Sequence, residues 1–226
     1  MTKLALFDID KTLIKSSTGH RAAFSIAFKE VYGVNASIDI IQPSGMTDQQ
    51  IIFEVLKIKG LDEEKIKSKL DLCMEKMVEA FNKTIGSDEV VILPGVKELL
   101  EKFKANNILM GLVTGNLEPI ARGKMKKLNL NHYFKVGGFG NEHIDRTDLV
   151  KIAIKKAQSN FDFIFSDNVY LFGDAPQDMK AGSEAGIIPI GVTTGIYSKK
   201  QLENAGATLV LNGFTDTEEI LRYILK

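Results

Sequence analysis

The sequence predicts an α/β protein with a doubly wound parallel sheet and an inserted all-α unit. Short apolar runs alternate with helical patterns over most of the 226 residues, and this alternation is typical of βαβ units. The apolar runs are nearly continuous, as expected for parallel strands that are buried on both faces. One long block lacks such runs and contains only helical patterns. Together these observations predict a Rossmann-like core with a helical insertion.

The strands and helices of the predicted core follow one another in regular order. Strands are predicted at residues 4–9, 108–114, 133–138, 169–174, 187–193 and 208–211. Helices are predicted at residues 94–107, 116–129, 146–158, 175–186 and 215–226. Pro94 stands near the first turn of its helix, a position that proline favours. Thr215 is the expected N-cap of the last helix.

The block between residues 16 and 90 is predicted to form the separate all-α unit, with the core at 1–15 and 91–226. Its helical patterns lie at residues 20–33, 47–60 and 62–86. The last of these carries apolar residues at spacings of three and four, which predicts one long helix: Ile66, Leu70, Cys73, Met77 and Phe81. The two connections are expected near residues 15–18 and 86–91.

Composition excludes several classes of protein. The 29 basic and 29 acidic residues balance, which argues against a nucleic-acid binder but not against a local basic pocket. The single cysteine, Cys73, excludes an internal disulfide and is expected to be a small apolar helix residue. No run of about 18 apolar residues exists to span a membrane. We expect a soluble, cytoplasmic protein, and the sequence carries no signal for its oligomeric state.

Polar residues that could carry chemistry fall at the ends of three predicted strands. They are Asp8, Asp10, Thr114, Gly115, Asp174 and Asp178. Ligands of open parallel sheets bind beyond the carboxyl ends of the strands, so these residues are expected to meet. Converging carboxylates need a counter-ion, and an all-oxygen set suits Mg²⁺. Because Mg²⁺ often shares its coordination sphere with a phosphate, the expected substrate is a phosphate ester.

Three motifs resemble those of the haloacid dehalogenase superfamily. FDIDKTL (7–13) resembles the DxDxT signature, and LVTGN (112–116) is similar to the second motif, a Ser or Thr that ends an apolar strand. GDAPQD (173–178) is similar to the acidic GDxxxD motif. The helical block lies where one large class, similar to phosphoglycolate phosphatases, carries an α-helical cap. The resemblance therefore implies a capped hydrolase and covers nearly the whole chain.

The resemblance implies a role for each acidic residue. Asp8 would be the nucleophile that forms an aspartyl-phosphate, and Asp10 would be the general acid–base. Mg²⁺ would be held by the carboxylates of Asp8 and Asp174 and by the backbone carbonyl of Asp10. Asp178 would orient the cation or a water, although an acidic residue in the first turn of a helix is also common without such a role.

The phosphoryl group would be bound by the second and third motifs. Thr114 would donate its hydroxyl, helped by the backbone N–H groups of Gly115 and Asn116, unless these two form only a plain turn. The third motif is a Lys or Arg near the start of the helix before GDxxxD. Arg146 is our choice for it, and Lys151 is the alternative.

Several residues outside these motifs have more than one possible role or position. Lys124 is expected to be a solvated helix residue. His20 is expected to be a surface or packing residue, unless the first helix of the block faces the site. Residues 45–48 either contact the substrate or only begin a helix capped by Thr47. Lys11 stands where the family commonly has Gly, and we expect it at the solvent or cap interface, or else attracting anionic substrates.

The predicted function is a Mg²⁺-dependent phosphatase that acts on a small phosphomonoester, such as phosphoglycolate or a sugar or nucleotide phosphate. Asp10 favours a phosphate-ester enzyme, since family members that split carbon–halogen or carbon–phosphorus bonds lack this residue. A hexose phosphomutase is the alternative on the same scaffold. A third hypothesis, a phosphate-binding protein without catalysis, finds no positive support, because the motif residues are present.

Overall fold

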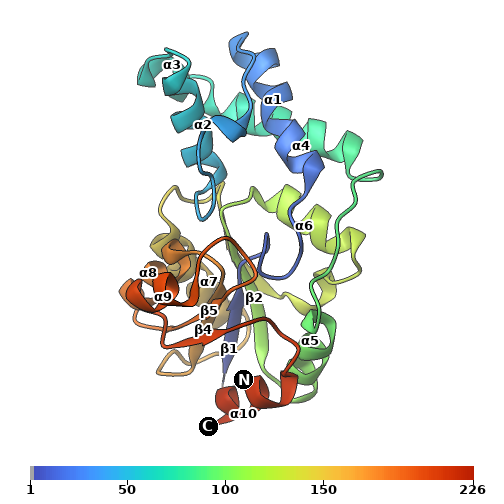
Figure 1. Cartoon of the computed structure of the whole chain (residues 1–226), viewed down its shortest axis with the longest axis vertical. Helices are drawn as coiled ribbons and strands as arrows, with labels where there is room; N and C mark the ends of the chain where they lie inside the picture. Colours follow the sequence, from blue (N-terminus) through green and yellow to red (C-terminus); the bar gives the residue numbers. More distant parts are fainter. Residues whose placement is uncertain (1–2) are drawn as a thin grey trace.

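The computed structural model describes residues 3–226, and one sheet of parallel strands forms its centre (Figure 1). The strand order is β3-β2-β1-β4-β5-β6, so the first strand of the chain lies in the middle. The strands are β1 (Leu4–Phe7), β2 (Leu109–Thr114), β3 (Val136–Phe139), β4 (Val169–Gly173), β5 (Ile188–Val192) and β6 (Leu209–Leu211). The chain runs outward from β1 on one side and then on the other, which confirms the predicted doubly wound sheet.

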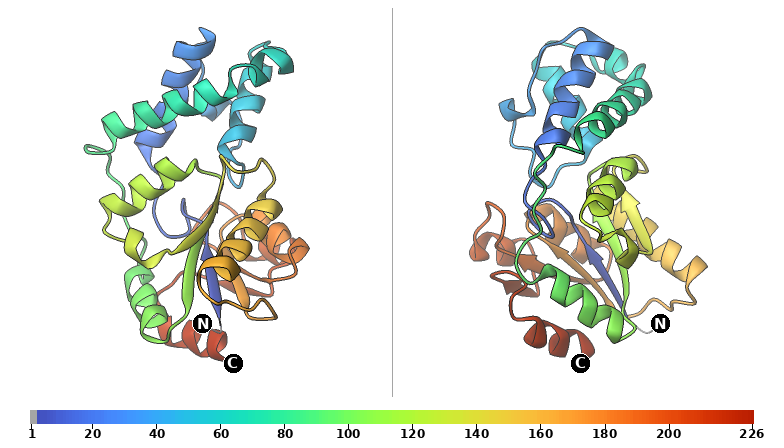
Figure 2. Two further views of the ribbon diagram at one scale, coloured as in Figure 1. Left: turned by 180° about the vertical axis from the view of Figure 1, so that it is seen from behind. Right: turned by 90° about the vertical axis from the view of Figure 1, so that its right-hand side faces the viewer.

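Helices cover both faces of the sheet (Figure 2). They are α5 (Val96–Ala105), α6 (Glu118–Lys127), α7 (Arg146–Asn160), α8 (Pro176–Glu184), α9 (Lys199–Asn204) and α10 (Thr217–Leu225). Alternate residues of β1 enter different cores because strand side chains alternate between faces. Phe7 packs in the core under α5 and α10, whereas Leu6 packs in the core under α7 and α8. Both faces of the sheet are thus sealed, and ligands must approach its end.

The bounds of β1 and β3 differ from the predicted ones by two or more residues at one end, whereas those of the other strands differ by at most one residue at either end. β1 ends at Phe7 rather than at residue 9, although the Asp8 N–H still donates to the Phe172 carbonyl at 2.9 Å. The amides of Thr12 and Leu13 then bond back to the Ile9 carbonyl, so the chain turns out of the sheet. The strand predicted at 133–138 begins only at Val136, after a short 3₁₀ helix, η2 (Asn131–Tyr133).

Two helix predictions were wrong in detail, and one helix was not predicted. The helix predicted at 62–86 is divided into α3 (Glu63–Lys67) and α4 (Leu70–Thr84). Ser68 lies between them and bonds its hydroxyl to the Lys65 carbonyl, a local contact that competes with helix continuation. Helix α9 was missed, although Ser198 and Gln201 form a capping box that the sequence displays. The N-cap of α10 is Asp216 rather than Thr215, because the Asp216 carboxylate accepts from the Glu219 amide.

The helical block packs around a hydrophobic core of its own. It consists of α1 (Thr18–Tyr32), η1 (Ile38–Ile40), α2 (Asp48–Ile58), α3 and α4. Cys73 is fully buried in this core with Phe28 and Phe81, as predicted for a small apolar residue. Helix α6 joins the two cores: Ile120 packs with the block, and Met125 packs with the sheet. Within residues 3–226, no helix is long and apolar enough to cross a bilayer.

The two chain segments that connect the block to the sheet are tied together. The Asp88 carboxylate accepts from the Thr18 amide at 3.1 Å and from the Ser17 hydroxyl. Lys127 of α6 donates to the carbonyls of Ile85 and Gly86 at 2.6 and 3.0 Å. Both connections are therefore anchored at the level of α6.

Phe172→Ala is expected to lower the free energy of unfolding by about 3–5 kcal/mol, because it empties the centre of the core. The Phe172 ring is fully buried and stacks on Phe7 with their centroids 4.8 Å apart. Urea unfolding measures this difference. Phe165→Ala is the matched control, since Phe165 is 39% exposed, and it should cost less than about 1 kcal/mol. Equal losses in the two variants would contradict the packing described.

Candidate active site

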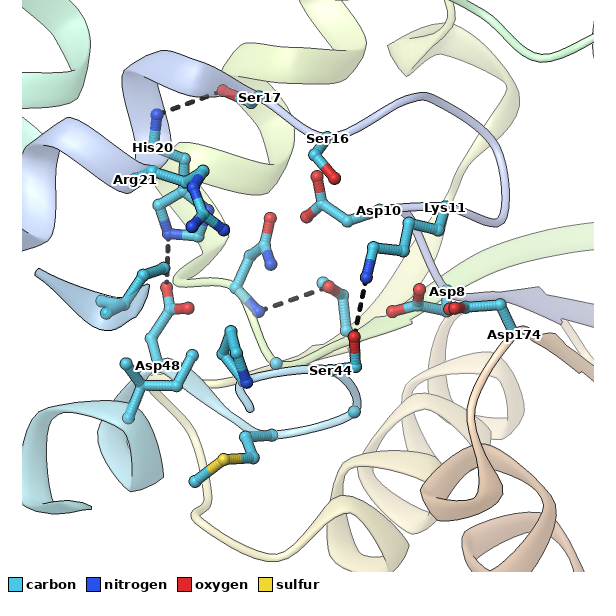
Figure 3. A pocket seen from close by; sticks show the side chains of 18 of the residues that line it. Asp8, Asp10, Lys11, Ser16, Ser17, His20, Arg21, Ser44, Asp48 and Asp174 are labelled. Carbon is cyan, nitrogen blue, oxygen red and sulfur yellow. Dashed lines mark hydrogen bonds and ion pairs between the residues drawn. The ribbon is translucent and has the colours of Figure 1, made fainter. Parts of the chain in front are cut away.

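A small cavity lies where the carboxyl ends of the central strands meet the helical block (Figure 3). Its volume is about 110 Å³. The walls are supplied by the segments after β1, β2 and β4, by helix α1 and by the loop at residues 43–48. Side chains from sequence positions far apart therefore line one cavity, as predicted from the strand ends.

Asp8 and Arg146 form the floor of this cavity. Asp8 follows β1 directly and is 6% exposed. Arg146, the first residue of α7, places its NH2 group 2.5 Å from Asp8 Oδ1 and its Nε 2.7 Å from Asp178 Oδ1. The structure thus places Arg146 beside the candidate nucleophile. Lys151, the alternative, is exposed and pairs with Asp148 at 3.3 Å.

Three carboxylates converge on this floor. Oxygens of Asp8, Asp174 and Asp178 lie within 4.8 Å of one another, and all three residues are buried. Burial raises the pKa of Asp8 to about 7, with Arg146 acting in the opposite direction. Burial, with the charges of Asp8 and Asp178, raises the pKa of Asp174 to about 8. The charges of Arg146 and Lys11, which act in the opposite direction, do not offset these effects.

The donor set of this cluster fits a hard divalent cation. Asp174 Oδ2 is buried and has no hydrogen-bond partner among the described residues. Buried polar atoms of native proteins are nearly always satisfied, so an unpaired carboxylate oxygen in a carboxylate cluster points to a ligand. The donors are all oxygens, which is the preference of Mg²⁺.

The end of β2 and the residues after it form another wall of the cavity. Thr114 is fully buried at the strand end, and its hydroxyl accepts from the Asn116 amide at 3.3 Å. The Gly115 carbonyl accepts from the Asp48 amide of α2 at 2.8 Å. A Cβ at position 115 would overlap the backbone of Met46 and Thr47. Gly115 is therefore required for the close approach of the helical block, beyond the role predicted for it.

The prediction for Lys124 was wrong. It was expected in solvent, but it is fully buried on α6. Its ammonium lies 2.6 Å from Asp10 Oδ2, 2.7 Å from Asn116 Oδ1 and 3.1 Å from His20 Nδ1. The signal was present, because Lys124 shares the buried face of α6 with Ile120 at a spacing of four. Burial acts to raise the pKa of Asp10, but the charges of Lys124 and His20 and the hydrogen bonds of Lys124 and Asn116 together outweigh it and hold that pKa below its ordinary value.

The helical block contributes a buried pair to the same network. His20 Nε2 of α1 lies 3.1 Å from Asp48 Oδ2 of α2 (Figure 3). The same Asp48 oxygen accepts from the Leu117 amide at 2.9 Å. His20 therefore faces the site, which was the less expected of its two possibilities. Thr47 caps α2 as predicted, through a capping box with Gln50, and residues 45, 46 and 48 also line the cavity.

Lys11 lies at the interface with the helical block, one of the positions expected for it. Its Nζ donates to the Ser44 hydroxyl at 2.7 Å (Figure 3). Its backbone has a φ of 66°, in the left-handed region where glycine carries no steric penalty. This explains why a glycine is suited to the position and shows what the lysine adds, which is a tie to the loop at 43–48.

Comparison with known proteins identifies the family. The family model of haloacid dehalogenase-like hydrolases matches residues 5–192, and the chain belongs to this family. The phosphorylated carbohydrates phosphatase of Thermotoga maritima is 25% identical, over 97% of this chain and 96% of its own. The phosphoglycolate phosphatase of Pseudomonas fluorescens is 21% identical, over 94% and 77%. The predicted family and the prediction of a hydrolase are confirmed.

Solved structures share the fold over the full chain. A hydrolase from Pseudomonas syringae has a TM-score of 0.73 at 24% identity, covering 98% of this chain and 99% of its own. A Bacteroides vulgatus protein, named provisionally as a β-phosphoglucomutase, has a TM-score of 0.70 at 25% identity, covering 99% and 88%. These likenesses confirm the α/β fold class.

Asp174→Asn should stabilise the metal-free protein at alkaline pH. A carboxyl whose folded pKa, about 8, exceeds the unfolded value adds stability at low pH that is lost as pH rises through this interval. In EDTA, the advantage of the variant over wild type should grow from pH 5 to pH 9, to on the order of a few kcal/mol. Urea unfolding measures it. Asp167→Asn, at an exposed loop position, should show no such trend, and a constant difference for Asp174→Asn would contradict the raised pKa.

Proposed function

We propose that the protein is a Mg²⁺-dependent phosphatase that hydrolyses a small phosphomonoester through an aspartyl-phosphate on Asp8. The observation that carries the proposal is a buried Asp8 carboxylate beside Arg146 in a small cavity. Asp10 lines the same cavity two residues further along the chain. A candidate nucleophile, a candidate phosphate-binding cation and a candidate acid–base lie within one site, which supports this proposal.

The cation would be held by the carboxylates of Asp8 and Asp174 and by the backbone carbonyl of Asp10, with Asp178 supporting it. When bound, it would offset the negative charge of the carboxylates and of the phosphoryl oxygens. The oxygen donors and the unpaired Asp174 Oδ2 support this assignment.

The chain's own residues account for the two chemical steps. Asp8 attacks phosphorus, the bond from phosphorus to the ester oxygen breaks, and Asp10 gives its proton to the departing alkoxide. Asp10 then takes a proton from a water, whose oxygen attacks phosphorus and returns Asp8 as a carboxylate. Arg146 and the hydroxyl of Thr114 hold phosphoryl oxygens throughout, and the N–H groups of Gly115 and Asn116 are offered as further donors.

Residues 16–90 would act as the cap domain of this enzyme, with residues 1–15 and 91–226 as its core. The block has its own hydrophobic core, and its loop at 43–48 closes the cavity. A closed cap would keep bulk water away from the reacting groups. Substrate entry would then require the block to move about the connections that Asp88 ties together.

The cavity favours a short substrate. Its volume, about 110 Å³, is below the range of about 300–1,000 Å³ that is typical of pockets for drug-sized ligands. A phosphoryl group with a two- or three-atom organic part suits this space better than a hexose phosphate. The phosphoglycolate phosphatase among the relatives supports a substrate of that size. A hexose phosphomutase is the second candidate, and it rests on the provisionally named Bacteroides vulgatus protein.

Asp8→Asn is expected to reduce kcat/KM by about 10³-fold or more, because the amide cannot act as the nucleophile. Initial rates of phosphate release in the presence of Mg²⁺ measure the loss. EDTA should abolish wild-type activity, and added Mg²⁺ should restore it. Asp167→Asn serves as the control for removal of a carboxylate and should keep wild-type rates. Full activity in Asp8→Asn would overturn the mechanism.

Phosphoglycolate is expected to be hydrolysed with a higher kcat/KM than glucose 1-phosphate or glucose 6-phosphate, because the closed cavity is small. A panel of phosphate esters, with phosphate release measured for each, tests this order. Analysis of the hexose reactions for isomerised sugar phosphate tests the second candidate. Isomerisation faster than phosphate release would replace the phosphatase by the phosphomutase.

A further inference from the structure

We propose that Lys124 is the positioning residue of Asp10, and that the helical block completes its binding site through His20 and Asp48. The proposal rests on the proposed function, in which Asp10 is the general acid–base. It gives a role to a buried lysine that the three motifs do not include.

The partners of Lys124 match the donor capacity of an ammonium group. Lysine has three N–H donors and no acceptor. The structure supplies three acceptors at 2.6, 2.7 and 3.1 Å, on Asp10, Asn116 and His20. Burial of a charged amine costs several kcal/mol unless it is paired and hydrogen-bonded. A lysine that is fully buried and fully satisfied is therefore held in one place, and it holds its partners in turn.

Lys124 acts on Asp10 from the side away from the substrate. The Lys124 side chain is 0% exposed, whereas the Asp10 side chain is 27% exposed. Asp10 lines the cavity and Lys124 does not. The lysine thus fixes one oxygen of the carboxylate from behind and cannot itself reach a substrate. Its effect on the reaction must pass through the orientation of Asp10.

The third acceptor links this arrangement to the position of the helical block. His20 Nδ1 accepts from Lys124, so Nε2 carries the ring proton and donates to Asp48. Asp48 is itself held by the Leu117 amide at 2.9 Å. His20 and Asp48 come from α1 and α2, whereas Lys124, Asn116 and Leu117 come from the region after β2. Asp10 is therefore fully positioned only when the block is docked.

The test compares two esters of similar size whose leaving groups differ in acidity: ethyl phosphate and 2,2,2-trifluoroethyl phosphate. Trifluoroethanol is the stronger acid, so its departure needs less help from a general acid. We expect Lys124→Met to lower kcat/KM on ethyl phosphate about 10-fold more than on the trifluoroethyl ester. Loss of the Lys124 charge by itself would favour the protonated acid form of Asp10, so this preferential loss reports the lost orientation of the carboxyl group. A purely structural loss would lower both equally. Lys126→Met, at an exposed neighbouring position, should change neither rate.

The Asp10→Asn variant separates the two proposals. It should show the same preferential loss on ethyl phosphate, and adding Lys124→Met to it should not increase that preference. Equal losses on both esters in Asp10→Asn would overturn the acid role of Asp10, and with it the role of Lys124. Preferential loss in Asp10→Asn but equal losses in Lys124→Met would overturn the role of Lys124 alone.

A second variant, in the helical block, keeps the proposal testable if Lys124→Met misfolds. Urea unfolding detects such misfolding. His20→Phe keeps a ring but removes the acceptor for Lys124. We expect it to lower kcat/KM preferentially on ethyl phosphate, by a smaller factor than Lys124→Met because two acceptors remain. Equal losses on the two esters in a folded His20→Phe protein would overturn the proposal even if Lys124→Met fails to fold.

Discussion

Three carboxylates and one guanidinium share a small buried volume at the end of the sheet, and this charge imbalance governs the structure around it. Asp8, Asp174 and Asp178 approach within 4.8 Å; Arg146 pairs with Asp8 and Asp178, and the charge of Lys11 acts on Asp174. Like charges at this separation repel strongly where water is scarce. The fold maintains the arrangement because each acidic residue follows a strand or begins a helix whose position is set by the packed cores. The repulsion is thus a property of the fold, and a bound cation would relieve it.

Helix α6 connects the residues of this site to the helical block. It begins directly after the segment that carries Thr114, and its two faces enter two different cores. Lys124 reaches the block through His20, and Lys127 reaches the connecting segment through backbone carbonyls. These lysines differ in burial and in partners. One shapes the site and the other anchors a connection, so a single helix serves both tasks.

The sheet and the acidic residues at its end were predictable because each rests on a local pattern. Continuous apolar runs mark buried parallel strands, and Asp8 and Asp174 stand out as acidic residues at the ends of such runs. The strand bounds were less accessible, since β1 ends where the turn around Ile9 begins. Lys124 was not recognised because its partners lie far away in sequence, 104 residues in the case of His20. Its place on the buried face of α6 was the only local sign.

The left-handed backbone conformation of Lys11 affects two properties of the protein in opposite ways: its thermal stability and the closure of its cavity. An L-residue in this conformation carries a backbone cost of about 1 kcal/mol that glycine does not. The same lysine reaches Ser44 and ties the loop that covers the cavity. Selection for thermal stability alone would favour glycine at this position, and it would release the loop at the same time. A glycine at residue 11 would therefore favour thermal stability, whereas the lysine favours a closed cavity.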